Sequence, residues 1–119
     1  MPVAERVVPD MSEIEVPEVG VDELEVALTE GAVLIDVREA EEFETVRVPG
    51  ARLIPLSEVE ERCREIPDDS RVYVICAKGG RSRAAVEFLR EYGTDAVNVA
   101  GGTMAWLDSG KAVSSGAPV

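Results

Sequence analysis

The chain has 119 residues, 45% of them hydrophobic, which suits one small domain with a mainly aliphatic core. Its formal net charge of −12 argues against a nucleic-acid or anionic-membrane partner, because both repel an acidic surface. With no histidine and two cysteines, the chain cannot form a Cys–His dyad, a Ser–His–Asp triad or a usual structural zinc site.

The N-terminal part of the sequence contains an irregular segment followed by a short strand and one helix. Residues 1–11 mix proline, valine and acidic residues without periodicity, which predicts a flexible arm. Residues 12–16 indicate a short first strand. Leu24 and Leu28 fall on one face of a helix that is predicted over residues 21–29.

Three elements are predicted next along the chain. The apolar run over residues 32–37 is typical of a strand that is covered on both faces. Residues 39–44 are mainly acidic and predict a short helix or turn. Residues 52–54 predict the third strand, so strand and helix signals alternate.

The following helix carries the first of the two cysteines. Ser57 is predicted as its N-cap, with Glu60 completing a capping box, and the helix is predicted to end before Pro67. Cys63 lies at helical spacing with apolar neighbours, which predicts a residue packed in the core. The alternative is a resolving thiol for Cys76, although buried structural cysteines are usually inert.

The second half of the chain continues the alternation. After a turn over residues 67–70, the central strand is predicted over residues 71–75. A helix over residues 83–92, a strand over residues 96–99 and a helix over residues 103–107 follow.

This order of elements predicts an α/β domain with a parallel sheet over residues 12–112. Residues 113–119 are small and polar, and they predict a flexible C-terminal tail. Sites in open α/β sheets lie beyond the carboxyl ends of the strands. Functional residues are therefore expected at those ends.

The strongest candidate is Cys76, which follows the central strand and opens a glycine-containing loop before the next helix. The residues that follow it are the predicted substrate-binding residues: Ala77, Lys78, Gly79, Gly80, Arg81 and Ser82. The N–H groups of such a turn and a helix N-terminus form an anion site, which can lower the pKa of a thiol. The two cations favour a reactive thiol over a buried strand-end cysteine beside an ordinary turn.

Four further residues lie at the same edge of the predicted sheet. Asp36 and Arg38 follow a neighbouring strand. Gly101 and Gly102 follow the last strand, and they either bring a backbone close to the loop or turn the chain into the last helix.

Four stretches, in order over roughly residues 20–110, resemble the motifs of rhodanese-type sulfurtransferases. They are Asp36–Phe43 (Asp-Val-Arg-x-x-x-Glu-aromatic in the family), Pro49–Pro55 (Gly-Ala-x-x-Ile-Pro), the active-site loop Cys76–Ser82, and Gly101–Trp106 (Gly-Gly-x-x-Ala-Trp). One departure is Val46-Arg47-Val48, where the family commonly has Gly-His-Ile. We expect this change to affect local packing and not activity.

The resemblance implies a rhodanese-like α/β fold with a five-stranded, mostly parallel sheet and helices on both faces. It also implies that Asp36 and Arg38 brace the loop, the alternative being an ordinary surface pair. The implied activity moves sulfane sulfur from thiosulfate or a related persulfide donor to a thiophilic acceptor through a persulfide on Cys76.

No metal or organic cofactor is implied. The expected partners are a small anionic sulfur donor and a thiol, cyanide or protein acceptor, with no nucleic acid and no membrane. We expect a monomer. The sequence has neither an apolar run of about 18 residues nor a basic-then-apolar leader, which predicts a cytoplasmic protein.

Two other functions stay open. One is a non-catalytic rhodanese-like module that relays or senses sulfur through a protein contact, although the basic residues beside Cys76 argue against it. The other is a cysteine-dependent phosphatase. Four residues separate Cys76 from Arg81, whereas such phosphatases use a Cys-x5-Arg loop, so the loop length favours sulfur over phosphate.

Overall fold

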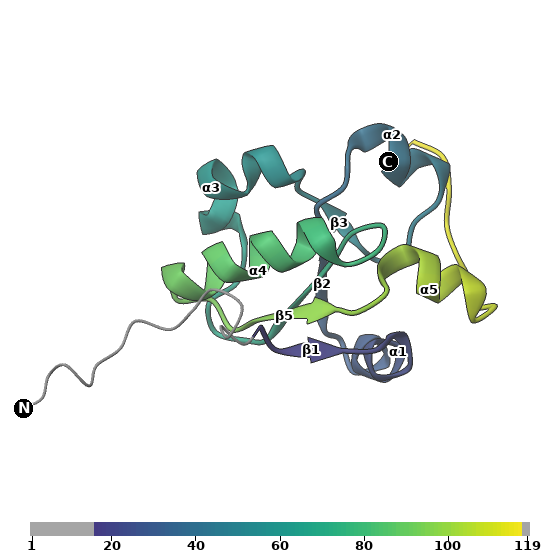
Figure 1. Cartoon of the computed structure of the whole chain (residues 1–119), viewed down its shortest axis with the longest axis horizontal. Coiled ribbons are helices and arrows are strands. Elements are labelled where there is room, and N and C mark those ends of the chain that lie inside the picture. Colours follow the sequence, from purple (N-terminus) through teal and green to yellow (C-terminus); the bar gives the residue numbers. More distant parts are fainter. Residues whose placement is uncertain (1–15, 118–119) are drawn as a thin grey trace, which may run out of the picture.

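The fold is built on a five-stranded sheet in which every neighbouring pair of strands is parallel (Figure 1). The computed structural model describes residues 16–117. The strands, in sheet order, are β1 (Glu18–Val19), β5 (Ala96–Val99), β4 (Val72–Ile75), β2 (Val33–Asp36) and β3 (Arg52–Leu53). The strand that leads to Cys76, β4, is therefore central, as the sequence predicts.

Helices connect the strands and cover both faces of the sheet, which confirms the predicted fold class. They are α1 (Val21–Thr29), α2 (Ala40–Thr45), α3 (Val59–Arg62), α4 (Gly80–Tyr92) and α5 (Gly102–Asp108), with short 3-10 segments η3 (Leu56–Glu58) and η4 (Cys63–Glu65) flanking α3. The bounds of α1 and β5 match the predicted ranges. Within residues 16–117, no helix combines the length and apolar character that crossing a bilayer requires.

Two hydrophobic clusters pack against the two faces of the sheet. On one face, Val86 and Leu89 of α4 pack with Val74 of β4. On the other face, Leu24 of α1 and Trp106 of α5 share a separate cluster. Because β4 is covered on both faces, its carboxyl end lies between two helical layers.

The capping box predicted at Ser57 is wrong. Ser57 lies inside η3, and neither η3 nor α3 begins with a side-chain hydrogen bond. The chain enters the helix directly after β3, because the Leu56 N–H still bonds the Val37 carbonyl at 3.0 Å. This leaves Pro55, which has no side-chain acceptor, at the capping position.

Helix α4 begins at Gly80 instead of the predicted Arg83. Gly79 has a φ of +115°, a left-handed conformation that glycine adopts without steric cost. The chain therefore turns sharply into the helix. As a result the loop after Cys76 contains only residues 77–79, and Ser82 lies in the first turn of α4.

The predicted arm, residues 1–11, lies outside the described residues, as do residues 12–15 of the predicted first strand. The first described strand is β1, which begins at Glu18 and pairs with β5. Within the described residues, the sheet begins at Glu18.

Part of the segment over residues 113–119, which is predicted to be a flexible tail, is attached to the end of α2. Ser114 and Arg47 exchange two backbone hydrogen bonds of 2.9 Å, and the Gly116 N–H donates to the Glu44 carbonyl at 2.7 Å. The Arg47 guanidinium lies 4.6 Å from the centroid of the Phe43 ring and donates to the carbonyls of Phe43 and Gly116. Arg47, at the position of the family's histidine, thus joins α2 to the C-terminal segment.

Candidate active site

Cys76 lies directly after β4 at the carboxyl edge of the sheet, and its side chain is 1% exposed. Alternate residues of a strand point to opposite faces, so the Cys76 side chain follows that of Val74 toward α4. The short loop and the first turn of α4 enclose the sulfur.

Two hydrogen bonds reach the Cys76 sulfur from this enclosure. The Gly79 N–H lies 3.1 Å from Sγ, and the Ser82 hydroxyl oxygen lies 3.3 Å from it. Burial raises the pKa of Cys76, but hydrogen bonds from the Ser82 hydroxyl and from the N–H groups of Ser82, Gly79 and Lys78 outweigh this effect, so the pKa lies below its ordinary value. The site thus favours a thiolate, the nucleophilic form, without a histidine base.

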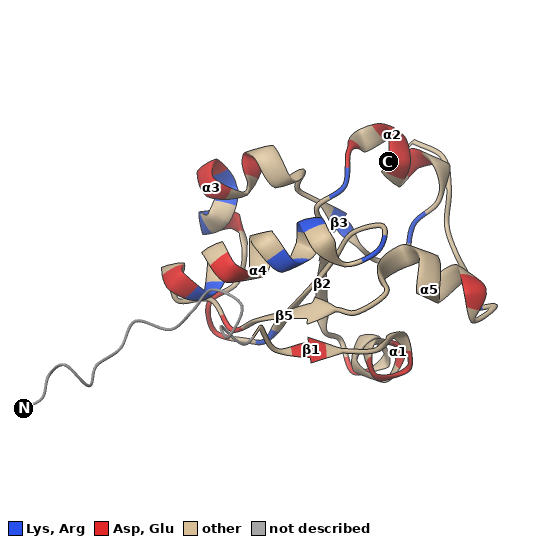
Figure 2. Cartoon of the chain, viewed as in Figure 1, with Lys and Arg blue, Asp and Glu red and all other residues tan. Residues whose placement is uncertain are grey.

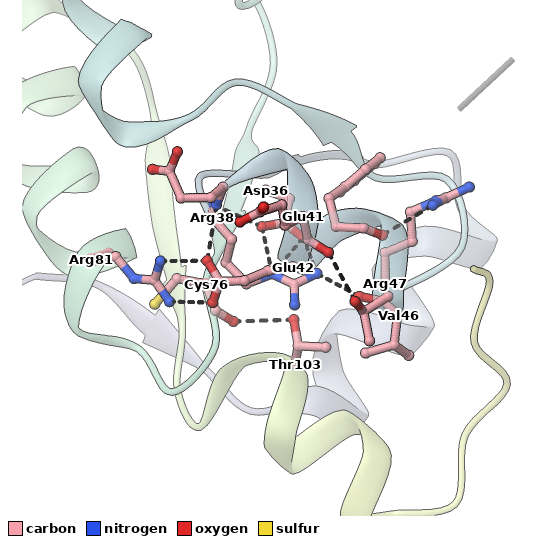
Figure 3. Close-up of polar contacts among 12 residues, drawn as sticks. Asp36, Arg38, Glu41, Glu42, Val46, Arg47, Cys76, Arg81 and Thr103 are labelled. Carbon is pink, nitrogen blue, oxygen red and sulfur yellow. Dashed lines mark hydrogen bonds and ion pairs between the residues drawn. The ribbon is translucent and has the colours of Figure 1, made fainter. Parts of the chain in front are cut away.

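The start of α5 packs against the backbone of the same loop (Figure 3). The N–H groups of Thr103 and Met104 donate to the carbonyls of Cys76 and Ala77 at 2.8 and 3.0 Å, and the Thr103 hydroxyl also donates to the Cys76 carbonyl, at 3.1 Å. Gly102 has a φ of +59°, and a Cβ there would lie 2.5 Å from both carbonyl oxygens. Of the two roles left open for the paired glycines, close backbone approach therefore applies to Gly102.

Arg81 is engaged by Glu42 of α2 (Figure 3). Two guanidinium nitrogens donate to the two carboxylate oxygens at 2.7 and 2.9 Å. The Arg81 hydrogen bond lowers the pKa of Glu42 to about 2, and Glu42 in turn raises the pKa of Arg81. Because both side chains are more than one third exposed, the pair fixes geometry more than it adds stability.

Lys78 is exposed, and within the described part of the chain it forms no ion pair. Lys and Arg surround the β4–α4 loop, whereas Asp and Glu dominate α1 and α2 (Figure 2). Lys78 is therefore a positive charge that is available to a ligand beside Cys76.

Asp36 and Arg38 form a buried ion pair, with relative exposures of 0% and 4%. Arg38 Nη2 lies 2.8 Å from Asp36 Oδ2, and it also donates to the Val46 carbonyl at 2.7 Å. Among residues 16–117, no hydrogen bond joins this pair directly to the Cys76 loop. It instead fixes the chain after α2, the helix that supplies Glu42 to Arg81.

The remaining predicted residues contribute backbone. The Ala77 carbonyl accepts the bond from α5, and Gly80 is the exposed first residue of α4. Two functional residues were not predicted from the sequence. Glu42 is one, although it is the glutamate of the first family motif. Asn98 is the other, a buried amide 2.5 Å from the Ser82 hydroxyl, and its signal was a lone polar residue in an apolar strand.

Cys63 packs as predicted. It is 6% exposed, belongs to the cluster beneath α4, and its Sγ donates to the Glu60 carbonyl at 3.3 Å. Both cysteines are free thiols. In the described chain, no three His, Cys, Asp or Glu side chains gather in a way that would hold a metal ion.

A family model described as the rhodanese-like domain matches residues 20–109. The uncharacterized protein YqhL of Bacillus subtilis is 46% identical over 76 residues, which cover 63% of this chain and 60% of that protein. A sulfurtransferase of Allochromatium vinosum is 35% identical over 83 residues, which cover 69% of this chain and 78% of that protein. The chain spans between 40% and 60% of the length of three of its curated relatives.

Solved structures agree with the sequence comparison. The crystal structure of a rhodanese-related protein from Thermoplasma volcanium superposes with a TM-score of 0.78 at 34% sequence identity. The match covers 82% of this chain and 97% of that one. Most of this chain therefore shares the architecture of that protein.

Proposed function

Because the chain belongs to the rhodanese-like sulfurtransferase family, we propose that it moves sulfane sulfur from thiosulfate or a related persulfide donor to a thiophilic acceptor through a persulfide on Cys76. One observation carries this proposal. A buried thiol with a lowered pKa lies in a ring of hydrogen-bond donors, beside an available lysine. Such a ring suits both a thiolate and the terminal anion of a persulfide.

In the first half of the cycle, the Cys76 thiolate attacks the outer sulfur of thiosulfate. A new S–S bond forms on Cys76, the S–S bond of thiosulfate breaks, and sulfite leaves with the electron pair. Sulfite is already a good leaving group, so the step needs no strong general acid. In the second half, a thiolate or cyanide acceptor attacks the terminal sulfur, and Cys76 leaves as the thiolate.

The two cations are assigned different roles. Lys78 is exposed in the loop and attracts the anionic donor in an otherwise acidic protein. Arg81 keeps the first turn of α4 in place through its bidentate pair with Glu42. This assignment differs from the sequence-based expectation, in which Lys78 and Arg81 are both substrate-binding residues.

A phosphatase is less well supported. Such an enzyme needs its loop arginine to hold phosphoryl oxygens bidentately, and here both ends of that fork are occupied by Glu42. A relay module that receives sulfur from a protein would use the same Cys76 persulfide, and it differs only in the donor. The cytoplasmic location and the monomeric state stay predictions.

Intact mass spectrometry tests the proposal. Thiosulfate is expected to add the mass of one sulfur atom to the protein, and cyanide is expected to remove it while thiocyanate appears. A relay module would instead take up sulfur from a protein persulfide and not from thiosulfate. Absence of added sulfur with every donor, or Cys76-dependent release of phosphate from aryl phosphates, would refute sulfur transfer.

The roles of Lys78 and Arg81 can be separated by kinetics. Lys78→Ala is expected to raise the KM for thiosulfate several-fold at low salt, with an unchanged melting temperature, and high salt should reduce the difference by screening. Arg81→Ala is expected to lower kcat as well, because the loop loses its anchor on α2. Glu42→Gln, which weakens the same anchor without removing a cation, should resemble Arg81→Ala. These separate roles would be contradicted if Lys78→Ala and Arg81→Ala raised the KM equally, with the same dependence on salt, and if neither changed kcat.

A further inference from the structure

A buried chain of polar side chains lies behind the Cys76 sulfur. The Ser82 hydroxyl lies 3.3 Å from Cys76 Sγ and 2.5 Å from Asn98 Oδ1. Cys76, Ser82 and Asn98 are exposed by 1%, 0% and 1%. Water therefore does not replace a hydrogen bond that is lost among these three side chains.

The Asn98 amide is held in one orientation. Its nitrogen donates to Oε2 of Glu18 on β1 at 2.9 Å and to the Gly79 carbonyl at 3.3 Å. Both partners are acceptors only, so a flipped amide would place its oxygen against two other oxygens. The amide oxygen is thereby fixed toward Ser82.

Ser82 cannot satisfy both of its acceptors at once. A hydroxyl has a single hydrogen, and here it lies between an amide oxygen and a sulfur. When Cys76 is a thiol, its S–H can donate to Ser82 while Ser82 donates to Asn98, and every group is paired. When Cys76 is a thiolate it only accepts, so the Ser82 hydrogen must turn to the sulfur and leave the buried Asn98 oxygen unpaired.

We infer that Asn98 is a positioning residue for Cys76, because its amide oxygen competes with the thiolate for the hydroxyl hydrogen of Ser82. In the proposed sulfur-transfer cycle, on which this inference rests, that hydrogen turns to Sγ in the free thiolate. It returns to Asn98 once the terminal sulfur carries the negative charge. Only the hydroxyl rotates, and the thiol proton is lost to solvent. Asn98 therefore limits how far Ser82 stabilises the unloaded thiolate.

Charged groups also lie on the elements around Cys76. They are Glu18 on β1, Asp36 and Arg38 at the end of β2, Glu42 on α2, Lys78 in the loop and Arg81 on α4. Of these side chains, Asn98 contacts only that of Glu18. A Glu18→Gln background controls for this contact, because glutamine keeps an acceptor oxygen and removes the charge.

The experiment measures the pH dependence of iodoacetamide alkylation at Cys76, located by peptide mass spectrometry. Asn98→Ala removes the competing acceptor, so the pH midpoint is expected to fall by about 0.5–1 pH unit, as the loss of one hydrogen-bond competitor predicts. Ser82→Ala removes the donor, so the midpoint is expected to rise. The Asn98→Ala shift should persist in the Glu18→Gln background.

A double-mutant cycle distinguishes this role from a merely structural one. Without the Ser82 hydroxyl, Asn98 has nothing to compete for, so Asn98→Ala is expected to leave the midpoint unchanged in a Ser82→Ala background. An equal shift in both backgrounds, or an unchanged or raised midpoint in Asn98→Ala alone, would overturn the inference.

A second variant guards against a failure of the first one to fold. If Asn98→Ala does not fold, Asn98→Val also lacks the acceptor and suits a buried strand, and the same shift is expected. The alkylation assay needs no sulfur donor or acceptor. Its outcome is therefore independent of the proposed function. A protein that fails to load sulfur can still show the Asn98 effect, and a protein that loads sulfur can lack it.

Discussion

Cys76→Ser is expected to abolish sulfur loading and to lower turnover roughly 10³-fold or more, because covalent transfer has no route without its nucleophile. Serine keeps the size of the site and its hydrogen bond from Gly79, so the fold should be unchanged. The loss should appear both as missing sulfur in the intact mass and as missing thiocyanate after cyanide. Turnover that continues in the variant would place the reactive group elsewhere.

The matched control is Cys63→Ser, which removes the other free thiol. Cys63 is buried beneath α4, so this variant is expected to lose some stability and to keep sulfur loading. A stalled persulfide, or an internal disulfide that depends on Cys63, would instead identify it as a resolving thiol.

The pH dependence of loading follows from the lowered pKa of Cys76. Only the thiolate attacks. The loading rate should therefore fall about tenfold for each pH unit below that pKa and level off above it. Because hydrogen bonds depress the pKa of Cys76, the plateau is expected to begin at a lower pH than it would for a free cysteine.

The second large effect is expected at Gly102, where α5 meets the Cys76 loop. In Gly102→Ala, the new Cβ would lie 2.5 Å from the carbonyl oxygens of Cys76 and Ala77, in a left-handed conformation. Overpacking costs about 1–3 kcal/mol, and a non-glycine residue in this conformation costs roughly 1–2 kcal/mol more. Denaturant unfolding should show the loss, and Cys76 alkylation should change because its carbonyl is displaced.

Gly110→Ala is the matched control for the backbone conformation. Gly110 has a similar φ of +76°, but nothing lies within 4 Å of the position that its Cβ would take. This variant is expected to lose only the stability that the left-handed conformation costs a non-glycine residue, and the reactivity of Cys76 should not change. Equal losses of stability in the two variants would show that the contact with the loop is unimportant.

Much of the fold is encoded locally. The continuous apolar run before Cys76 predicts a strand that is covered on both faces. The helices on either side of it are predicted by the helical spacing of their apolar residues. The exact match of α1 reflects such a local signal. The failed capping box at Ser57 shows the limit, because a backbone hydrogen bond from Leu56 to Val37, the residue after β2, decided where that helix begins.

By itself, the sequence determined the class of the site: a strand-end cysteine, a glycine turn and nearby cations, in the motif order of one family. Only the tertiary structure decided how the cations are used, because Glu42 is 39 residues from Arg81 in sequence and still binds it. Likewise, Asn98 reaches Ser82 only because β5 lies beside β4 and α4 crosses above them. A pattern along the chain fixes which residues share an element, whereas charge pairing and competition for one hydrogen depend on which elements meet.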